Sequence, residues 1–216
     1  MDKFAFSPLT GLSRREALGR LAGFTAVTAF GTISSAAFGE SFADGFGDHF
    51  DAAQDGPKTE KLTDSIAVLS GVGGNIAVLT GKNGTLQVDA GNPGTMPGVK
   101  KAISALTGSA VELLVNTHWH GDHTGGNGDT AAAGARIYAH DNVRKRLSTD
   151  QFMEAFNRKV PASPEIALPV LTFGSRMTLH HNGEEIVLTH VAPAHTDGDI
   201  LVHFESECAA LWRPVF

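Results

Sequence analysis

The chain after residue 60 alternates short apolar runs with turn residues. The first three runs are "SIAVLSG" (65–71), "NIAVLTG" (75–81) and "TLQVDAG" (85–91), and each of them ends in glycine. Short apolar runs that end in turn residues are typical of β-strands. We therefore expect a meander of three strands at the start of the folded domain.

A helix is predicted to cross back over this sheet between Gly94 and Leu106. Val99, Ile103 and Leu106 recur at helical spacing, and two lysines occupy the opposite face. The apolar run "VELLVN" (111–116) that follows predicts a buried strand.

The next segment, "THWHGDHTGG" (117–126), is too rich in glycine and histidine to continue that strand. We expect a loop there, at the strand's C-terminal end, where open α/β sheets bind their ligands. The rest of the chain is expected to form a second half that is rich in β-strands. Its predicted elements are a strand at 135–140, helices at 141–147 and 150–157, and strands at 170–173, 176–181, 185–191 and 200–204.

The amino terminus resembles an export leader. Arg14 and Arg15 precede a mildly apolar run (21–38) without acidic residues, and small residues at 35–37 and 41–43 offer cleavage points. The arginine pair resembles a twin-arginine signal. An amphipathic helix with two solvated arginines is the alternative.

We therefore expect a signal peptide over 1–43, a polar linker over 44–60 and a single folded domain over 61–216. The localisation that follows is periplasmic or secreted. The apolar run is too short and too rich in small polar residues for a stable membrane anchor.

Composition narrows the chemistry. A net charge of −6 over 216 residues argues against a nucleic-acid partner, which needs clustered lysine and arginine. The single cysteine, Cys208, excludes an intrachain disulfide and multi-cysteine zinc motifs. A metal site in this chain must therefore use histidines and carboxylates.

Five residues of these types have a ligand-like arrangement. His118, His120, Asp122 and His123 lie within one loop, and His195 lies in "PAHTDGD" further along the chain. Zinc suits imidazole and carboxylate ligands without a thiolate. A histidine-rich surface loop is the alternative, but four ligand-type residues within six positions after a buried strand favour a metal site.

These motifs resemble the metallo-β-lactamase fold superfamily. The resemblance rests on "NTHWHGDHTGGN" (116–127) and "APAHTDGD" (192–199), and it extends to "LQVDAG" (86–91). It covers roughly residues 61–204. It implies an α/β fold, a four-layer αβ/βα sandwich with two face-to-face sheets and a mono- or dinuclear metal site at one edge.

The resemblance also implies roles for the five residues. His118, His120 and His195 would hold the first metal ion, and Asp122 and His123 would contribute to the second. Asp122 would in addition act in catalysis, by orienting the attacking water and passing a proton to the leaving group.

Three other aspartates are expected to support the ligands or to cap turns. Asp89 ends a predicted strand, and it is expected to be a partner of a ligand's second N–H or a strand-end cap. Asp197 and Asp199 flank His195 and have the same two interpretations. The other histidines after the leader that we expect to be structural are His140, His180, His181, His190 and His203.

The carboxyl end departs from the family. Residues 205–216, "ESECAALWRPVF", contain neither the Gly-Asp pair nor the later histidine of the hydrolase branch. We expect a truncated domain with an incomplete second half and an open sheet edge. A shifted reading frame and an early stop are the two open explanations.

We expect an exported hydrolase that uses zinc-bound hydroxide on a small ester, thioester, lactone or β-lactam. One or two Zn²⁺ ions are the expected cofactors, with iron and manganese as alternatives. The diiron flavoprotein branch carries glutamate in place of His120. Two alternatives stay open: a non-catalytic, truncated metal-binding fragment and a mononuclear-iron persulfide dioxygenase.

Overall fold

The computed structural model describes residues 56–154, 157–192, 194–206 and 209–211. The predicted signal peptide and most of the predicted linker lie outside these residues. In the described part of the chain, no helix is both long and apolar enough to span a membrane.

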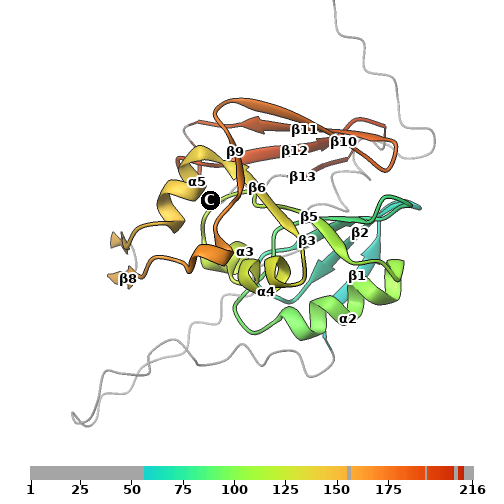
Figure 1. Cartoon of the computed structure of the whole chain (residues 1–216), viewed down its shortest axis with the longest axis horizontal. Helices are drawn as coiled ribbons and strands as arrows, with labels where there is room; N and C mark the ends of the chain where they lie inside the picture. Colours follow the sequence, from blue (N-terminus) through green and yellow to red (C-terminus); the bar gives the residue numbers. More distant parts are fainter. Residues whose placement is uncertain (1–55, 155–156, 193, 207–208, 212–216) are drawn as a thin grey trace, which may run out of the picture. The chain divides into compact units, whose positions relative to one another are not determined.

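Seven strands form the first sheet, in the order β1-β2-β3-β4-β5-β6-β9 (Figure 1). They are β1 (Lys58–Lys61), β2 (Ile66–Ser70), β3 (Ile76–Leu79), β4 (Thr85–Val88), β5 (Val111–Val115), β6 (Arg136–His140) and β9 (Leu171–Phe173). The first four pair antiparallel, which confirms the predicted meander and adds β1 to it. β4, β5, β6 and β9 pair parallel, so their carboxyl ends meet at one edge.

Four antiparallel strands form the second sheet, drawn in orange to red in Figure 1. They are β10 (Arg176–His181), β11 (Glu184–His190), β12 (Ile200–Phe204) and β13 (Ala209–Leu211). Leu86 and Val88 of the first sheet share one buried cluster with Leu188, Val202 and Phe204 of the second. The two sheets therefore pack face to face, as expected for the predicted sandwich.

Four helices and one 3-10 turn in the described part of the chain are interspersed among the strands of the first sheet along the sequence. They are α2 (Met96–Thr107), α3 (Gly121–Thr124), α4 (Asn127–Ala132), α5 (Asp141–Leu147) and the 3-10 turn η2 (Glu165–Ala167). α2 follows the predicted apolar stripe, since Val99 and Ile103 pack on Leu69, Ile76 and Val78 on the face of the sheet opposite the second sheet. The α/β class predicted from the sequence is confirmed.

The helix predicted over 150–157 is wrong. The structure places a two-stranded hairpin there, formed by β7 (Gln151–Met153) and β8 (Arg158–Val160). Asn157 adopts a φ of +45°, which breaks a helix, and Arg146 Nη1 donates a 3.0 Å hydrogen bond to Gln151 Oε1. Both features favour the hairpin.

One boundary and two strand pairings also differ from the predictions. β1 begins at Lys58, inside the range predicted as linker, because its backbone pairs with β2 although its side chains are exposed. β9 joins β6 in the first sheet rather than the second. β13, which was not predicted, pairs with β12 and is the outer strand of the second sheet.

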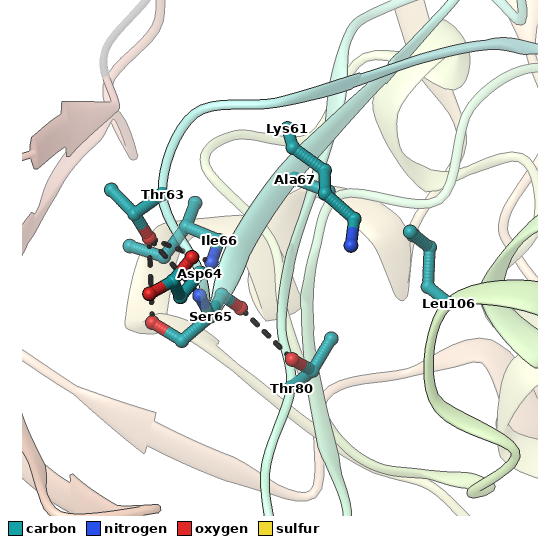
Figure 2. A pocket seen from close by; sticks show the side chains of 8 residues that line it. All are labelled: Lys61, Thr63, Asp64, Ser65, Ile66, Ala67, Thr80 and Leu106. Atoms are coloured by element: carbon teal, nitrogen blue, oxygen red, sulfur yellow. Dashed lines mark hydrogen bonds between the residues drawn. The ribbon is translucent and has the colours of Figure 1, made fainter.

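A tight turn joins β1 to β2 (Figure 2). Thr63 Oγ1 accepts hydrogen bonds from the backbone N–H groups of Ser65 and Ile66, at 3.2 and 3.0 Å. Thr80 Oγ1 donates to the carbonyl of Ser65 at 3.2 Å, which ties this turn to the end of β3. The turn lies at the far side of the meander and takes no part in the site described next.

Candidate metal centre

The histidine motif follows β5, at the edge where the parallel strands end. Asn116 and Asn127 close this segment at its base, because their buried amides exchange hydrogen bonds of 3.0 and 2.9 Å. Part of the predicted loop is the short helix α3, and Thr124 Oγ1 donates to the carbonyls of Trp119 and His120. The segment is therefore held rigidly between two elements.

Four imidazole rings meet at this segment. The ring of His118 lies at the centre, with centroid distances of 4.9 Å to His120, 4.2 Å to His123 and 5.1 Å to His195. His195 comes from the connection between β11 and β12, yet its Nε2 lies 2.9 Å from Nδ1 of His120, which is 75 residues away in sequence. The structure brings together the two motifs that the sequence separates.

Two overlapping groups of donor atoms result. Within each group the atoms lie within 4.8 Å of one another. The first group is His118, His120 and His195, and the second is His118, Asp122 and His123. All five residues predicted as ligands therefore lie together, and His118 belongs to both groups.

Asp89 supports the imidazole rings through hydrogen bonds. This buried aspartate directly follows β4 and has a φ of +64°, a conformation that is uncommon for a residue other than glycine. Its Oδ2 accepts from His123 Nδ1 at 2.6 Å and from Thr117 Oγ1 at 2.7 Å, and its Oδ1 accepts from Thr117 N at 2.8 Å. Asp89 is therefore a partner of the ligand rings, in line with the expectation for it.

Thr117 extends this support to His118. Its Oγ1 lies 3.1 Å from His118 Nδ1 and already donates its own proton to Asp89. The hydroxyl therefore accepts from His118 Nδ1–H, which leaves Nε2 of that ring with a free lone pair. Thr117 was not predicted from the sequence, although its place between a strand and the first histidine was a signal.

Two rings of the first group, His118 and His120, are neutral at physiological pH. Burial lowers the pKa of His118 to about 2, and the neighbouring rings of His123, His120 and His195 act in the same direction. Burial and His195 lower the pKa of His120 to about 4. Neutral imidazoles offer the lone pairs that a metal ion needs.

The second group carries charge of both signs. Burial by itself lowers the pKa of His123, but Asp89 and the hydrogen bond that the ring donates to Asp122 outweigh it and raise this pKa to about 10. Burial by itself raises the pKa of Asp122, but the hydrogen bond with His123 and the charge of His123 outweigh it and lower this pKa. Without metal, a protonated His123 therefore lies between two carboxylates.

Two glycines let the chain pass close to this ring. A Cβ on Gly74 would lie 2.4 Å from His123 Cε1, and one on Gly73 would lie 2.9 Å from the Asp122 carbonyl. The N–H of Gly74 donates to that same carbonyl at 2.8 Å. These two glycines were not singled out from the sequence, although two adjacent glycines beyond a buried strand are a signal for a close approach.

A second aspartate supports His195. Asp199 is buried, and its Oδ2 accepts from the N–H of His195 at 2.7 Å. Its Oδ1 accepts from the N–H of Thr196 at 3.0 Å and from its hydroxyl at 2.5 Å. Asp199 thus caps the turn that carries the third imidazole, one of the two roles expected for it.

The histidines predicted to be structural lie elsewhere. His140 and His190 stack on each other, with ring centroids 3.7 Å apart, and His203 pairs with Glu205 at 3.3 Å. Among the described residues, neither these three nor His180 and His181 belong to a group that could hold a metal ion.

The donor set fits a zinc ion. Three imidazoles converge in the first group, and one more imidazole and a carboxylate adjoin them. Zinc prefers such nitrogen and oxygen ligands, and each ligating ring needs a partner for its other N–H. Thr117 and Asp89 supply that partner for His118 and His123.

Comparison with known proteins agrees with this geometry. A sequence model of the metallo-beta-lactamase superfamily matches residues 69–207, more than half of the chain. The fold is also similar to three solved metallo-beta-lactamases, each 20% identical in sequence. They are MEM-A1, a subclass B3 enzyme from a soil metagenome library (TM-score 0.58, 69% of this chain and 58% of that one), the HARLDQ-motif enzyme of Cronobacter sakazakii (0.63, 74% and 63%) and BJP-1, a subclass B3 enzyme of Bradyrhizobium japonicum (0.57, 69% and 57%).

This likeness establishes the fold. The chain spans about three-fifths of the length of the structures it matches.

Proposed function

This chain belongs to the metallo-beta-lactamase superfamily, and on that premise we propose that it is an exported, zinc-dependent hydrolase of a small ester, thioester, lactone or β-lactam. The observation that carries the proposal is the convergence of His118, His120 and His195 beside Asp122 and His123. His118, His120 and His195 would hold the first zinc ion. Asp122 and His123 would take part in holding a second.

When bound, zinc supplies a Lewis acid for the scissile carbonyl and lowers the pKa of a coordinated water. Asp122 is ionised at neutral pH, and 37% of its side chain is exposed, so its carboxylate is open to the site. It accepts a hydrogen bond from the attacking water, holds that water in place and takes up its proton. Asp122 can then return this proton to the leaving group.

The remaining residues keep the site in shape. Asp89 fixes the ring of His123 directly and that of His118 through Thr117. Because these groups are buried, they need no reorganisation when a substrate binds. The reaction requires no protein nucleophile, and Cys208 has no part in the proposal.

Export is part of the proposal and rests on the sequence alone. Arg14 and Arg15, the apolar run and the small residues near position 43 support a twin-arginine signal. Fractionation of cells that express the full chain tests it. Wild-type chain is expected in the periplasm, and a chain with Arg14→Lys and Arg15→Lys in the cytoplasm; equal distribution of the two would contradict export.

Turnover by the zinc-loaded full chain tests the activity. Chromogenic substrates of four classes should be offered: an ester, a thioester, a lactone and a β-lactam. We expect hydrolysis of at least one class, and Asp122→Asn should slow it by about 10²- to 10⁴-fold. Asp129→Asn is the matched control, because Asp129 is exposed and lies outside both donor groups.

The alternatives give different results. Zinc bound without turnover of any class would favour the non-catalytic metal-binding protein. Iron retained in place of zinc, with oxygen consumed on a persulfide substrate, would favour the dioxygenase. Unchanged turnover by Asp122→Asn would contradict the role of that carboxylate.

A further inference from the structure

We propose that Arg146 on α5 is a positioning residue, which holds the His195 imidazole at the metal site by fixing Asp197 two residues further along the same loop. The inference rests on the proposed function only in that His195 serves as a ligand. His195 needs such support because it is exposed, whereas His118 is buried and its ring is fixed by a hydrogen bond with Thr117.

The contact between Arg146 and Asp197 has two hydrogen bonds. Arg146 Nε donates to Asp197 Oδ1 at 3.2 Å, and Nη2 donates to Oδ2 at 3.0 Å. Bidentate pairing of this kind fixes both the distance and the plane of the carboxylate. The third nitrogen, Nη1, donates to Gln151 Oε1 at 3.0 Å, so the guanidinium is itself held from a second side.

The backbone of Asp197 is held by the same region of the fold. Its carbonyl accepts from Asn142 Nδ2 at 2.7 Å and from His190 Nε2 at 3.1 Å. The ring of His190 in turn stacks on the buried His140, with an interplanar angle of 12°. Four hydrogen bonds therefore converge on one exposed turn residue, which is far more than a solvated turn needs.

The adjacent residues make the loop fit against α5. A Cβ on Gly198 would lie 3.0 Å from Val143 Cγ2 and 3.2 Å from the Val143 nitrogen, so the loop backbone touches the start of the helix. Asp199 holds the inner side of the loop through the N–H groups of His195 and Thr196. The loop is thus held at two positions, by the hydrogen bonds of Asp199 and by those of Asp197.

The ion pair between Arg146 and Asp197 is expected to contribute little to the overall stability of the protein. The side chains of Arg146 and Asp197 are 43% and 45% exposed. Exposed ion pairs contribute little to folding. A local role therefore predicts a particular combination, in which the loop and the metal affinity change while the protein stays equally stable.

The experiment compares full-length Arg146→Ala with Lys145→Ala. Lys145 is the adjacent exposed cation on α5, and its side chain makes no hydrogen bond or ion pair with the described residues. A third variant combines Arg146→Asp with Asp197→Arg and restores a pair of opposite charges. Three quantities are measured: amide hydrogen exchange of residues 194–199 in metal-free protein, cobalt(II) affinity with the visible cobalt spectrum, and the thermal midpoint.

Arg146→Ala is expected to speed exchange in this loop, to weaken cobalt binding on the order of 10- to 100-fold and to shift the cobalt spectrum. Its thermal midpoint should match that of Lys145→Ala, and the exchanged pair should recover part of the loss. Exchange and cobalt binding that equal those of Lys145→Ala would overturn the proposal. If wild-type protein bound no cobalt, the proposed function would fail, while the exchange rates of metal-free protein would still decide whether Arg146 holds the loop.

Discussion

Oδ2 of Asp89 lies 2.6 Å from Nδ1 of His123, and both side chains are buried. The same oxygen accepts a hydrogen bond from the hydroxyl of Thr117, and this hydroxyl in turn orients the ring of His118. One carboxylate at the end of a strand therefore sets two of the imidazoles. This arrangement makes the site dependent on a residue that is not itself among the candidate ligands.

Replacement of that carboxylate should destabilise the protein. Asp89→Ala leaves the buried N–H and hydroxyl of Thr117 and the Nδ1–H of His123 without their acceptor. We expect a loss of about 3–5 kcal/mol in the free energy of unfolding, measured with denaturant on metal-free protein. Asp129→Ala, at an exposed position, should change it by less than about 1 kcal/mol; equal effects of the two substitutions would refute the role of Asp89.

The absence of a side chain at Gly74 should be necessary for metal binding by the second group of ligands. In Gly74→Ala the new methyl would overlap the His123 ring, which Asp89 and Asp122 hold in place. We expect this variant to lose the second metal ion and to keep the first, as counted by titration with zinc. Gly121→Ala is the control, because a Cβ there meets no atom within 4 Å; an unchanged zinc count for Gly74→Ala would exclude this close contact.

Thr117→Val tests the link between Asp89 and His118. The substitution keeps the shape of the side chain and removes the hydroxyl that accepts from His118 Nδ1. Affinity for the first metal ion should fall on the order of 10- to 100-fold, since the ring loses its orienting partner. Thr130→Val removes a buried hydroxyl whose partners among the described residues are the Gly126 carbonyl and the Met96 sulfur, and it should leave the affinity unchanged.

The two groups should differ in how pH affects metal binding. His118 and His120, with pKa values of about 2 and about 4, have no proton to lose near neutral pH. His123, with a pKa of about 10, must lose its proton before it can bind. The second metal ion should therefore release about one proton from His123, and its affinity should rise about tenfold per unit as pH increases from about 7 towards 9.

Calorimetry in two buffers with different ionisation enthalpies measures this release. The first binding event should show no proton from His118 or His120. A second event whose affinity does not depend on pH would contradict the protonated state of His123.

The sequence was sufficient for the features that follow regular patterns. The glycine-terminated apolar runs predicted the meander, and the apolar stripe of Val99 and Ile103 predicted α2. The motif spacing identified all five residues that the structure brings together, because ligand types are written directly into the chain.

Other features depend on tertiary contacts that no local pattern carries. The hairpin at Gln151 forms where local spacing suggested a helix, since Arg146 and the backbone of Asn157 favour it. β9 pairs with β6 because the chain crosses back to the first sheet, which its three residues alone do not reveal. The closeness of Gly74 to His123 is likewise a property of the folded chain.

Metal content tests the central claim most directly. His118 is shared by both groups of donor atoms, whereas His181 is also buried but lies outside them. Wild-type protein and His181→Ala, loaded with zinc and freed of loosely bound metal, should each retain one or two zinc ions per chain, and His118→Ala should retain none. Equal zinc content in His118→Ala and His181→Ala would show that these side chains do not form the metal site.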